Sequence, residues 1–144
     1  MEKKLTMTIE PLPKERPRAT VVGGHARIYT PKTTASYEKK IRDAWIKANG
    51  DKPLTGPVIV RVWLGMPIPK SATKTNKALM LARKMRPVTK PDVDNLAKSV
   101  LDAINGVAYK DDNQIVDLVA RKVYADIPFV KVFVNDWEPK EEKA

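Results

Sequence analysis

The stretch KPDVDNLAKSVLDAINGVAYKDDNQIVD, from Lys90 to Asp117, concentrates negative charge in an otherwise basic chain. All of its acidic residues are aspartates: Asp92, Asp94, Asp102, Asp111, Asp112 and Asp117. The whole chain has 144 residues, with 27 Lys and Arg against 17 Asp and Glu, and its formal net charge is +10. A strongly positive balance favours polyanionic partners, nucleic acid above all.

The first half of this stretch predicts a helix over residues 94–105. Its apolar face consists of Leu96, Val100, Leu101 and Ile104. Gly106 is expected to end the helix and Asp94 to be its N-cap, a role worth about 1 kcal/mol. Capping does not account for Asp92. On an extended approach to the helix, residues i and i+2 point the same way, so the carboxylates of Asp92 and Asp94 can converge on one cation.

The sequence outside this stretch predicts a sheet and a second long helix. Apolar alternation and buried apolar runs predict strands at residues 3–10, 57–66, 116–125 and 128–135, and Gly23-Gly24 predicts a hairpin. Residues 33–48 place Tyr37, Ile41, Trp45 and Ala48 on one helical stripe. Thr33 or Thr34 is expected to cap this helix.

The order of these elements favours a compact α/β (α+β) domain with a mixed β-sheet flanked by helices. Residues 67–90 are expected to form a loop or a short helix. One domain over residues 1–144 suits the chain length, with residues 136–144 as a charged tail.

Positive charge gathers in two segments that read as loops or weakly structured chain. The N-terminal arm PLPKERPRAT is rich in proline and basic residues, and no acidic residue lies between Met66 and Pro91. Such segments suit contacts with DNA phosphates, the alternative being solvated surface loops. The expected DNA-binding residues are Lys14, Arg16, Arg18, Lys70, Lys74, Arg83, Lys84 and Arg86.

Carboxylates on such a surface repel phosphate unless they hold cations. Mg²⁺ takes oxygen ligands, keeps positions open for a substrate phosphate and can polarise a phosphodiester. Lys98, four residues after Asp94, either forms a surface ion pair or neutralises phosphate charge. Asp102 is interpreted as a partner of Lys98 in preference to a metal ligand. Asp111 and Asp112 face opposite ways on an extended chain, so only one of them is expected to be a ligand.

Several classes of site are excluded. The chain has no cysteine and one histidine, His25, which rules out thiolate sites and a His-rich zinc cluster. A calcium loop of the EF-hand type needs glycine and glutamate where this sequence has Ala97 and Ala103. No apolar run is long enough to span a membrane and no signal peptide is evident, so we expect a soluble, cytoplasmic protein.

The stretch KPDVDNLAKSVLDAINGVAYKDDNQIVDL resembles the signature of the RusA family of Holliday junction resolvases, including its prophage members. The arm PLPKERPRAT and the following ARIYTPKTTASYE resemble the same family, and the resemblance covers roughly residues 5–135. It implies a RusA-like fold and a metal-dependent endonuclease that resolves four-way DNA junctions. It also implies a homodimer, whose two-fold symmetry would match that of the junction.

The family's catalytic residues fall on Asp92, Asp94, Lys98 and Asp112 by this resemblance. It makes Asp92, Asp94 and Asp112 the ligands of Mg²⁺, with Mn²⁺ as a possible substitute. Asp111 stays open as an alternative to Asp112. The rival hypotheses are a junction-binding protein without nuclease activity, a nuclease for other branched DNA, and a phage assembly or interaction protein.

Overall fold

The computed structural model describes residues 2–15, 18–29 and 32–139. The strands are β1 (Glu2–Thr8), β2 (Arg18–Val22), β3 (His25–Tyr29), β4 (Val58–Pro67), β5 (Ile115–Ala125) and β6 (Phe129–Asp136). The helices are α1 (Lys32–Asn49), α2 (Lys74–Leu81), α3 (Val93–Ala103) and a short 3₁₀ turn, η1 (Asp112–Gln114). No helix among the described residues is long and apolar enough to cross a bilayer.

Four strands form one mixed sheet in the order β1-β6-β4-β5. β4 pairs in parallel with β5, whereas β6 runs antiparallel to both β1 and β4. Alternate residues of central strand β4 (Val58, Val60, Val62 and Leu64) are fully buried. This period of two marks the face that packs on the core. The strand predictions and the mixed sheet are therefore confirmed, with boundaries shifted by a few residues.

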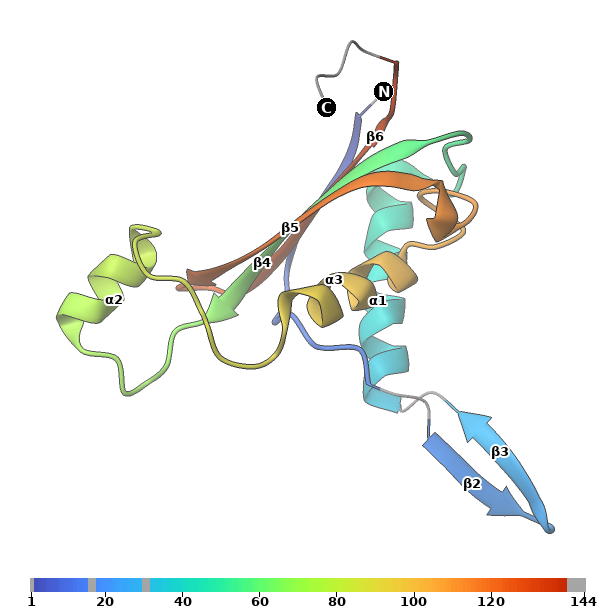
Figure 1. Cartoon of the computed structure of the whole chain (residues 1–144), viewed down its shortest axis with the longest axis horizontal. Coiled ribbons are helices and arrows are strands. Elements are labelled where there is room, and N and C mark those ends of the chain that lie inside the picture. The colour runs from blue at the N-terminus through green and yellow to red at the C-terminus, as the bar shows by residue number, and fades with distance from the viewer. Residues whose placement is uncertain (1, 16–17, 30–31, 140–144) are drawn as a thin grey trace.

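Helices α1 and α3 pack against this sheet and against each other (Figure 1). Each buries one stripe: Ile41 and Trp45 from α1, Leu96 and Val100 from α3, all without exposed surface. The predicted stripe of α1 is confirmed at Tyr37, Ile41 and Trp45. The predicted caps are wrong, because Thr33 and Thr34 lie inside α1, where Thr34 is buried.

Strands β2 and β3 form a separate hairpin that projects beyond the N-terminal end of α1 (Figure 1). Gly23 and Gly24 form its turn with φ of 58° and 81°, a left-handed conformation that favours glycine. The segment predicted as a loop or short helix contains α2, which contacts β5 at the end of the sheet away from the hairpin (Figure 1). Of the predicted tail, Asp136 ends β6, the Trp137 amide donates to the Pro57 carbonyl at 2.9 Å, and residues 140–144 lie outside the described residues.

The buried tyrosine Tyr37 makes the fold sensitive to alkaline pH. Burial raises the pKa of Tyr37 to about 12, slightly offset by the nearby Leu12 backbone, and its hydroxyl has no hydrogen bond of good geometry. A phenol whose pKa rises on folding stabilises the protein below its unfolded pKa of about 10, and that contribution is lost as pH rises towards 12.

We therefore expect the free energy of unfolding to fall between pH 10 and pH 12. In Tyr37→Phe, the free energy of unfolding should fall less steeply over this range, by about 1 kcal/mol or more per pH unit. At pH 7 the free energy of unfolding should change little. Urea unfolding over this pH range measures the effect. Tyr124→Phe is the matched control because Tyr124, on β5, is only half-buried. Equal slopes in all three proteins would contradict the prediction.

Candidate functional site

The start of α3 presents two aspartates to solvent. Asp92 is the N-cap residue, with φ −70° and ψ 145°, and its side chain makes no capping hydrogen bond. Asp94 lies in the first turn, where its Oδ1 accepts from the amide of the next residue, Asn95, at 3.0 Å. The prediction that Asp94 is the N-cap was wrong by two residues. Both carboxylates are exposed and free to bind a ligand.

The loop that leads into this helix is fastened to strand β5. The ammonium group of Lys122 donates to the carbonyls of Thr89 and Pro91, at 3.0 and 2.9 Å. These bonds fix the backbone immediately before Asp92. Lys122 is a positioning residue that the sequence analysis missed, because its partners are backbone atoms about thirty residues away.

Lys98 and Asp102 continue the polar stripe of α3, four residues apart. Lys98 Nζ lies 3.7 Å from Asp102 Oδ1, so the predicted pairing is confirmed. Asp102 Oδ2 also lies 3.2 Å from the ammonium of Lys14, which contacts Glu38 of α1 as well. Burial alone would lower the pKa of Lys14, but these two carboxylates outweigh it and raise the pKa. Lys14 thus ties the N-terminal arm to both helices.

Asp111 and Asp112 play different parts. Asp111 is the N-cap of η1, and its amide donates to Oε1 of Gln114 at 2.9 Å. Asp112 is the first residue of the turn and is exposed. Burial and then the charges of Asp112, Asp102 and Asp111 raise the pKa of Tyr109. The Tyr109 hydroxyl donates to the carbonyl of Leu101 at 2.7 Å. Tyr109, and with it Asp111 and Asp112, therefore lies beside the C-terminal half of α3.

The three predicted metal ligands are therefore not gathered at one point of a single chain. Within residues 2–15, 18–29 and 32–139, no group of three or more acidic or histidine side chains could hold a metal ion. The pair Asp92 and Asp94 still fits Mg²⁺ chemically, because that ion is commonly held by one or two carboxylates together with substrate phosphates. Asp112 lies beside the other end of the helix.

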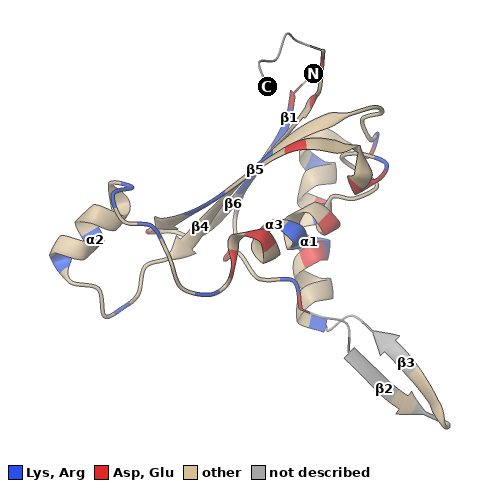
Figure 2. Ribbon diagram, in the orientation of Figure 1, with Lys and Arg blue, Asp and Glu red and all other residues tan. Residues whose placement is uncertain are grey.

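The predicted DNA-binding residues near α2 fall into two groups. Lys70, Lys74 and Lys84 are exposed and form no ion pair with any described residue. Arg83 and Arg86 are also exposed, but their guanidinium groups donate to the carbonyls of Tyr124 and Lys122. Figure 2 shows basic residues along α2 and the loop after it, with no acidic residue between them.

Arg16 lies outside the described residues, and only the backbone of Arg18, at the start of β2, is described. Lys14 is described, and its ammonium group already forms ion pairs with Glu38 and Asp102. The structure thus leaves Lys70, Lys74 and Lys84 as the predicted contacts with fully available ammonium groups.

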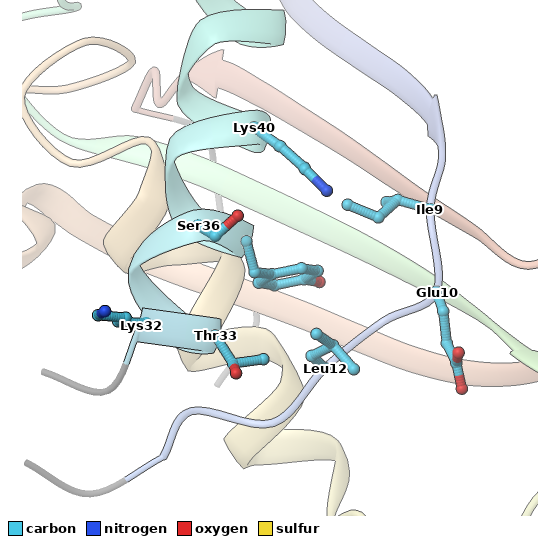
Figure 3. A pocket seen from close by; sticks show the side chains of 8 residues that line it. Ile9, Glu10, Leu12, Lys32, Thr33, Ser36 and Lys40 are labelled. Carbon is cyan, nitrogen blue, oxygen red and sulfur yellow. The ribbon is translucent and has the colours of Figure 1, made fainter.

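Two cavities flank the segment Ile9–Pro13. One, of about 490 Å³, adjoins the start of α3 and is lined by Glu10, Pro11, Leu12, Pro13, Met66, Lys90, Pro91, Asp92 and Asn95. The other, of about 470 Å³, lies against α1 and is lined by Ile9, Glu10, Leu12, Lys32, Thr33, Ser36, Tyr37 and Lys40. Figure 3 shows that Ile9 points toward Lys40 in this second cavity, while Glu10 points away from α1.

The exposed carboxylates at the start of α3 and the basic residues along α2 and the loop after it are typical of the class of protein that acts on nucleic acid. The sequence matches the family model described as Endodeoxyribonuclease RusA over residues 8–135. The chain belongs to this family, and it is therefore an endodeoxyribonuclease of a type that acts on junction DNA. The RusA resemblance and the fold class expected from it are confirmed.

A curated relative is similar over nearly its whole length. The "Uncharacterized protein YqaN" of Bacillus subtilis (strain 168) is 36% identical over 135 residues, which cover 92% of this chain and 95% of that protein. Its name assigns no activity.

Proposed function

We propose that this protein is a Mg²⁺-dependent endonuclease that resolves four-way DNA junctions by paired symmetric nicks. The observation that carries the proposal is the pair of uncommitted carboxylates, Asp92 and Asp94, at the start of α3 beside a basic surface. Asp92 and Asp94 would hold the ion, which would polarise the scissile phosphate. The structure does not group Asp112 with this pair, so its part as a third ligand is a separate proposal, which Asp112→Asn tests. Mn²⁺ is proposed as a substitute for Mg²⁺.

The chain's own residues would supply positioning and charge. Lys122 holds the loop before Asp92 in place. The side chain of Lys98 is 61% exposed and lies on the same face of α3 as Asp94, four residues before it. Its ammonium group would therefore neutralise charge that develops on the phosphate. Its ion pair with Asp102, at 3.7 Å, limits where that ammonium can lie.

A cleavage assay on a synthetic four-way junction, beside linear duplex and a flap, tests this function. We expect paired nicks on the junction that require Mg²⁺ and disappear in EDTA. Tight binding without any cleavage in Mg²⁺ or Mn²⁺ would favour the non-catalytic junction binder instead. Equal cleavage of the flap would favour a nuclease for branched DNA in general.

The exposed lysines near α2 should supply salt-dependent affinity. In the triple variant Lys70→Ala, Lys74→Ala, Lys84→Ala, we expect the slope of log K against log salt to fall by about one for each lysine that contacts a phosphate. Binding to a fluorescent junction at several salt concentrations measures it. Lys39→Ala is the control, since Lys39 pairs with Asp43 at 2.6 Å on α1. An unchanged slope in the triple variant would remove these lysines from the interface.

We propose that two copies act together, since the junction is nearly two-fold symmetric and needs two matched cuts. Strand β5 forms one edge of the sheet, and its Val116, Leu118 and Val119 are 52%, 47% and 40% exposed. An exposed aliphatic edge is normally covered by another chain or blunted by charge.

If β5 forms the contact, Leu118→Arg should convert a dimer into a monomer. Light scattering coupled to gel filtration gives the mass directly. Ile127→Arg is the control, because Ile127 is 66% exposed in the turn after β5. A wild-type mass of a monomer would refute the dimer, and a dimeric Leu118→Arg variant would move the contact to another surface.

A further inference from the structure

The cavity beside Asp92 has a composition unlike that of the basic surface around it. Its walls are mainly apolar: Pro11 and Met66 are buried, and Leu12 packs against the core. Its polar lining residues are Glu10, Lys90, Asp92 and Asn95. An apolar pocket with a few polar groups is the usual form of a site for a small, flat, partly polar ligand.

The walls of this cavity are rigid. Pro11 and Pro13 fix the backbone on one side. Pro91 on the other side is held through its carbonyl by Lys122, and Met66 is the last residue but one of the core strand β4. A preformed pocket orders a bound group at little entropic cost.

The polar groups are available for a ligand. The side chains of Glu10 and Asn95 have no hydrogen-bond or ion-pair partner among the described residues. Glu10 lines both this cavity and the one against α1, and Figure 3 shows that its side chain points away from α1. A carboxylate is acceptor-only, whereas the amide of Asn95 both donates and accepts.

We propose that this cavity binds one unstacked nucleobase of the DNA, next to the phosphate that is cut. The inference rests on the proposed function, because it uses Asp92 as the marker of the scissile phosphate. A base offers two apolar faces for the prolines, Leu12 and Met66, and a polar edge for Glu10 and Asn95. Volume does not limit the fit, since about 490 Å³ exceeds what one base requires.

The same chemistry gives the site a preference among bases. Glu10 can accept a hydrogen bond from an exocyclic amine, as carboxylates do from cytosine. Adenine, cytosine and guanine carry such an amine, and thymine does not. Thymine can offer the carboxylate only its ring N3–H, so we expect cleavage to be slowest where thymine must enter the pocket. Glu10 and Asn95 are thus specificity-determining residues for the base beside the cut.

The first measurement reports binding without cleavage. The fluorescent base 2-aminopurine is placed in turn at each nucleotide flanking the cleaved phosphate of a junction, and the protein is added without Mg²⁺. Because stacking quenches this base, we expect its fluorescence to rise at one of these positions on binding. No rise at any of them would overturn the pocket.

The second measurement compares cleavage rates with each of the four bases at the responsive position. Wild-type protein should cut at least about five-fold more slowly with thymine there, and Glu10→Gln should abolish that difference. Asn95→Leu should reduce the fluorescence rise. Glu138→Gln, the same change at an exposed residue away from the cavity, should match the wild type.

The results separate this inference from the nuclease proposal. Cleavage that is indifferent to the base, without any unstacked base, would overturn the pocket and leave the nuclease standing. A fluorescence rise without cleavage would support the pocket and overturn the nuclease. Absence of binding to the junction would overturn both.

Discussion

Replacing Asp92 by asparagine should reduce junction cleavage by at least about a thousand-fold and leave junction affinity unchanged. The carboxylate has no structural duty that asparagine would disturb, since its side chain makes no capping hydrogen bond. Asparagine keeps the shape but removes the charge that favours a divalent cation. Loss of a cation that supplies several kcal/mol to the transition state gives an effect of this size.

Single-turnover cleavage at saturating protein isolates the chemical step from binding. Asp126→Asn is the matched control, because Asp126 is an exposed aspartate that pairs with Lys77 at 3.8 Å on the protein surface. Cleavage retained in Asp92→Asn would remove this residue from the proposed metal ligands. Asp112→Asn and Asp111→Asn, assayed in parallel, would decide which of the late pair takes part.

Replacing Trp45 by alanine should destabilise the protein by about 3–5 kcal/mol, the usual cost of deleting a buried aromatic ring. Trp45 has no exposed surface and lies in the core under the sheet, on the helix that packs against α3. A change of this size should lower Tm by about 10 °C or more for a chain of this length. Urea unfolding followed by circular dichroism measures the loss.

Trp45→Phe is the informative comparison. The indole N–H is buried without a hydrogen-bond partner in the described part of the chain, so phenylalanine gives up volume but no bond. We expect it to lose clearly less stability than the alanine variant. A loss below about 1 kcal/mol for Trp45→Ala would mean that the core closes over the gap, contrary to the packing seen here.

The local pattern of side chains was enough to predict most elements. The alternation in β4 and the stripe Tyr37, Ile41 and Trp45 in α1 each reflect a single buried face, and such a face is written into the spacing of apolar residues. The pairing of Lys98 with Asp102 was predictable for the same reason, since residues four apart on a helix are neighbours. The N-cap of α3 could not be predicted in this way, because aspartate is a good cap residue at both position 92 and position 94. Asp92 is the N-cap because its backbone is extended where the helix begins.

Contacts between distant segments could not be predicted in this way. Arg83 and Arg86 were expected to contact phosphate, yet both guanidinium groups donate to carbonyls of β5. Lys14, from the arm, is bound to carboxylates of α1 and α3. A basic side chain looks the same in sequence whether it faces DNA or fastens a loop, and only its neighbours in space distinguish the two.

The sequence by itself determined the family, the mixed sheet with its two long helices, and the concentration of aspartates around α3. These features depend on residue type and short-range spacing, which the chain carries locally. Only the tertiary structure decided that Asp92 and Asp94 stand apart from Asp112, that Lys122 holds the loop before them, and that an apolar cavity adjoins Asp92. These three features depend on how β4, β5 and the N-terminal arm pack around α3. Packing between segments far apart in the sequence produces no regular spacing of residue types that could be recognised beforehand.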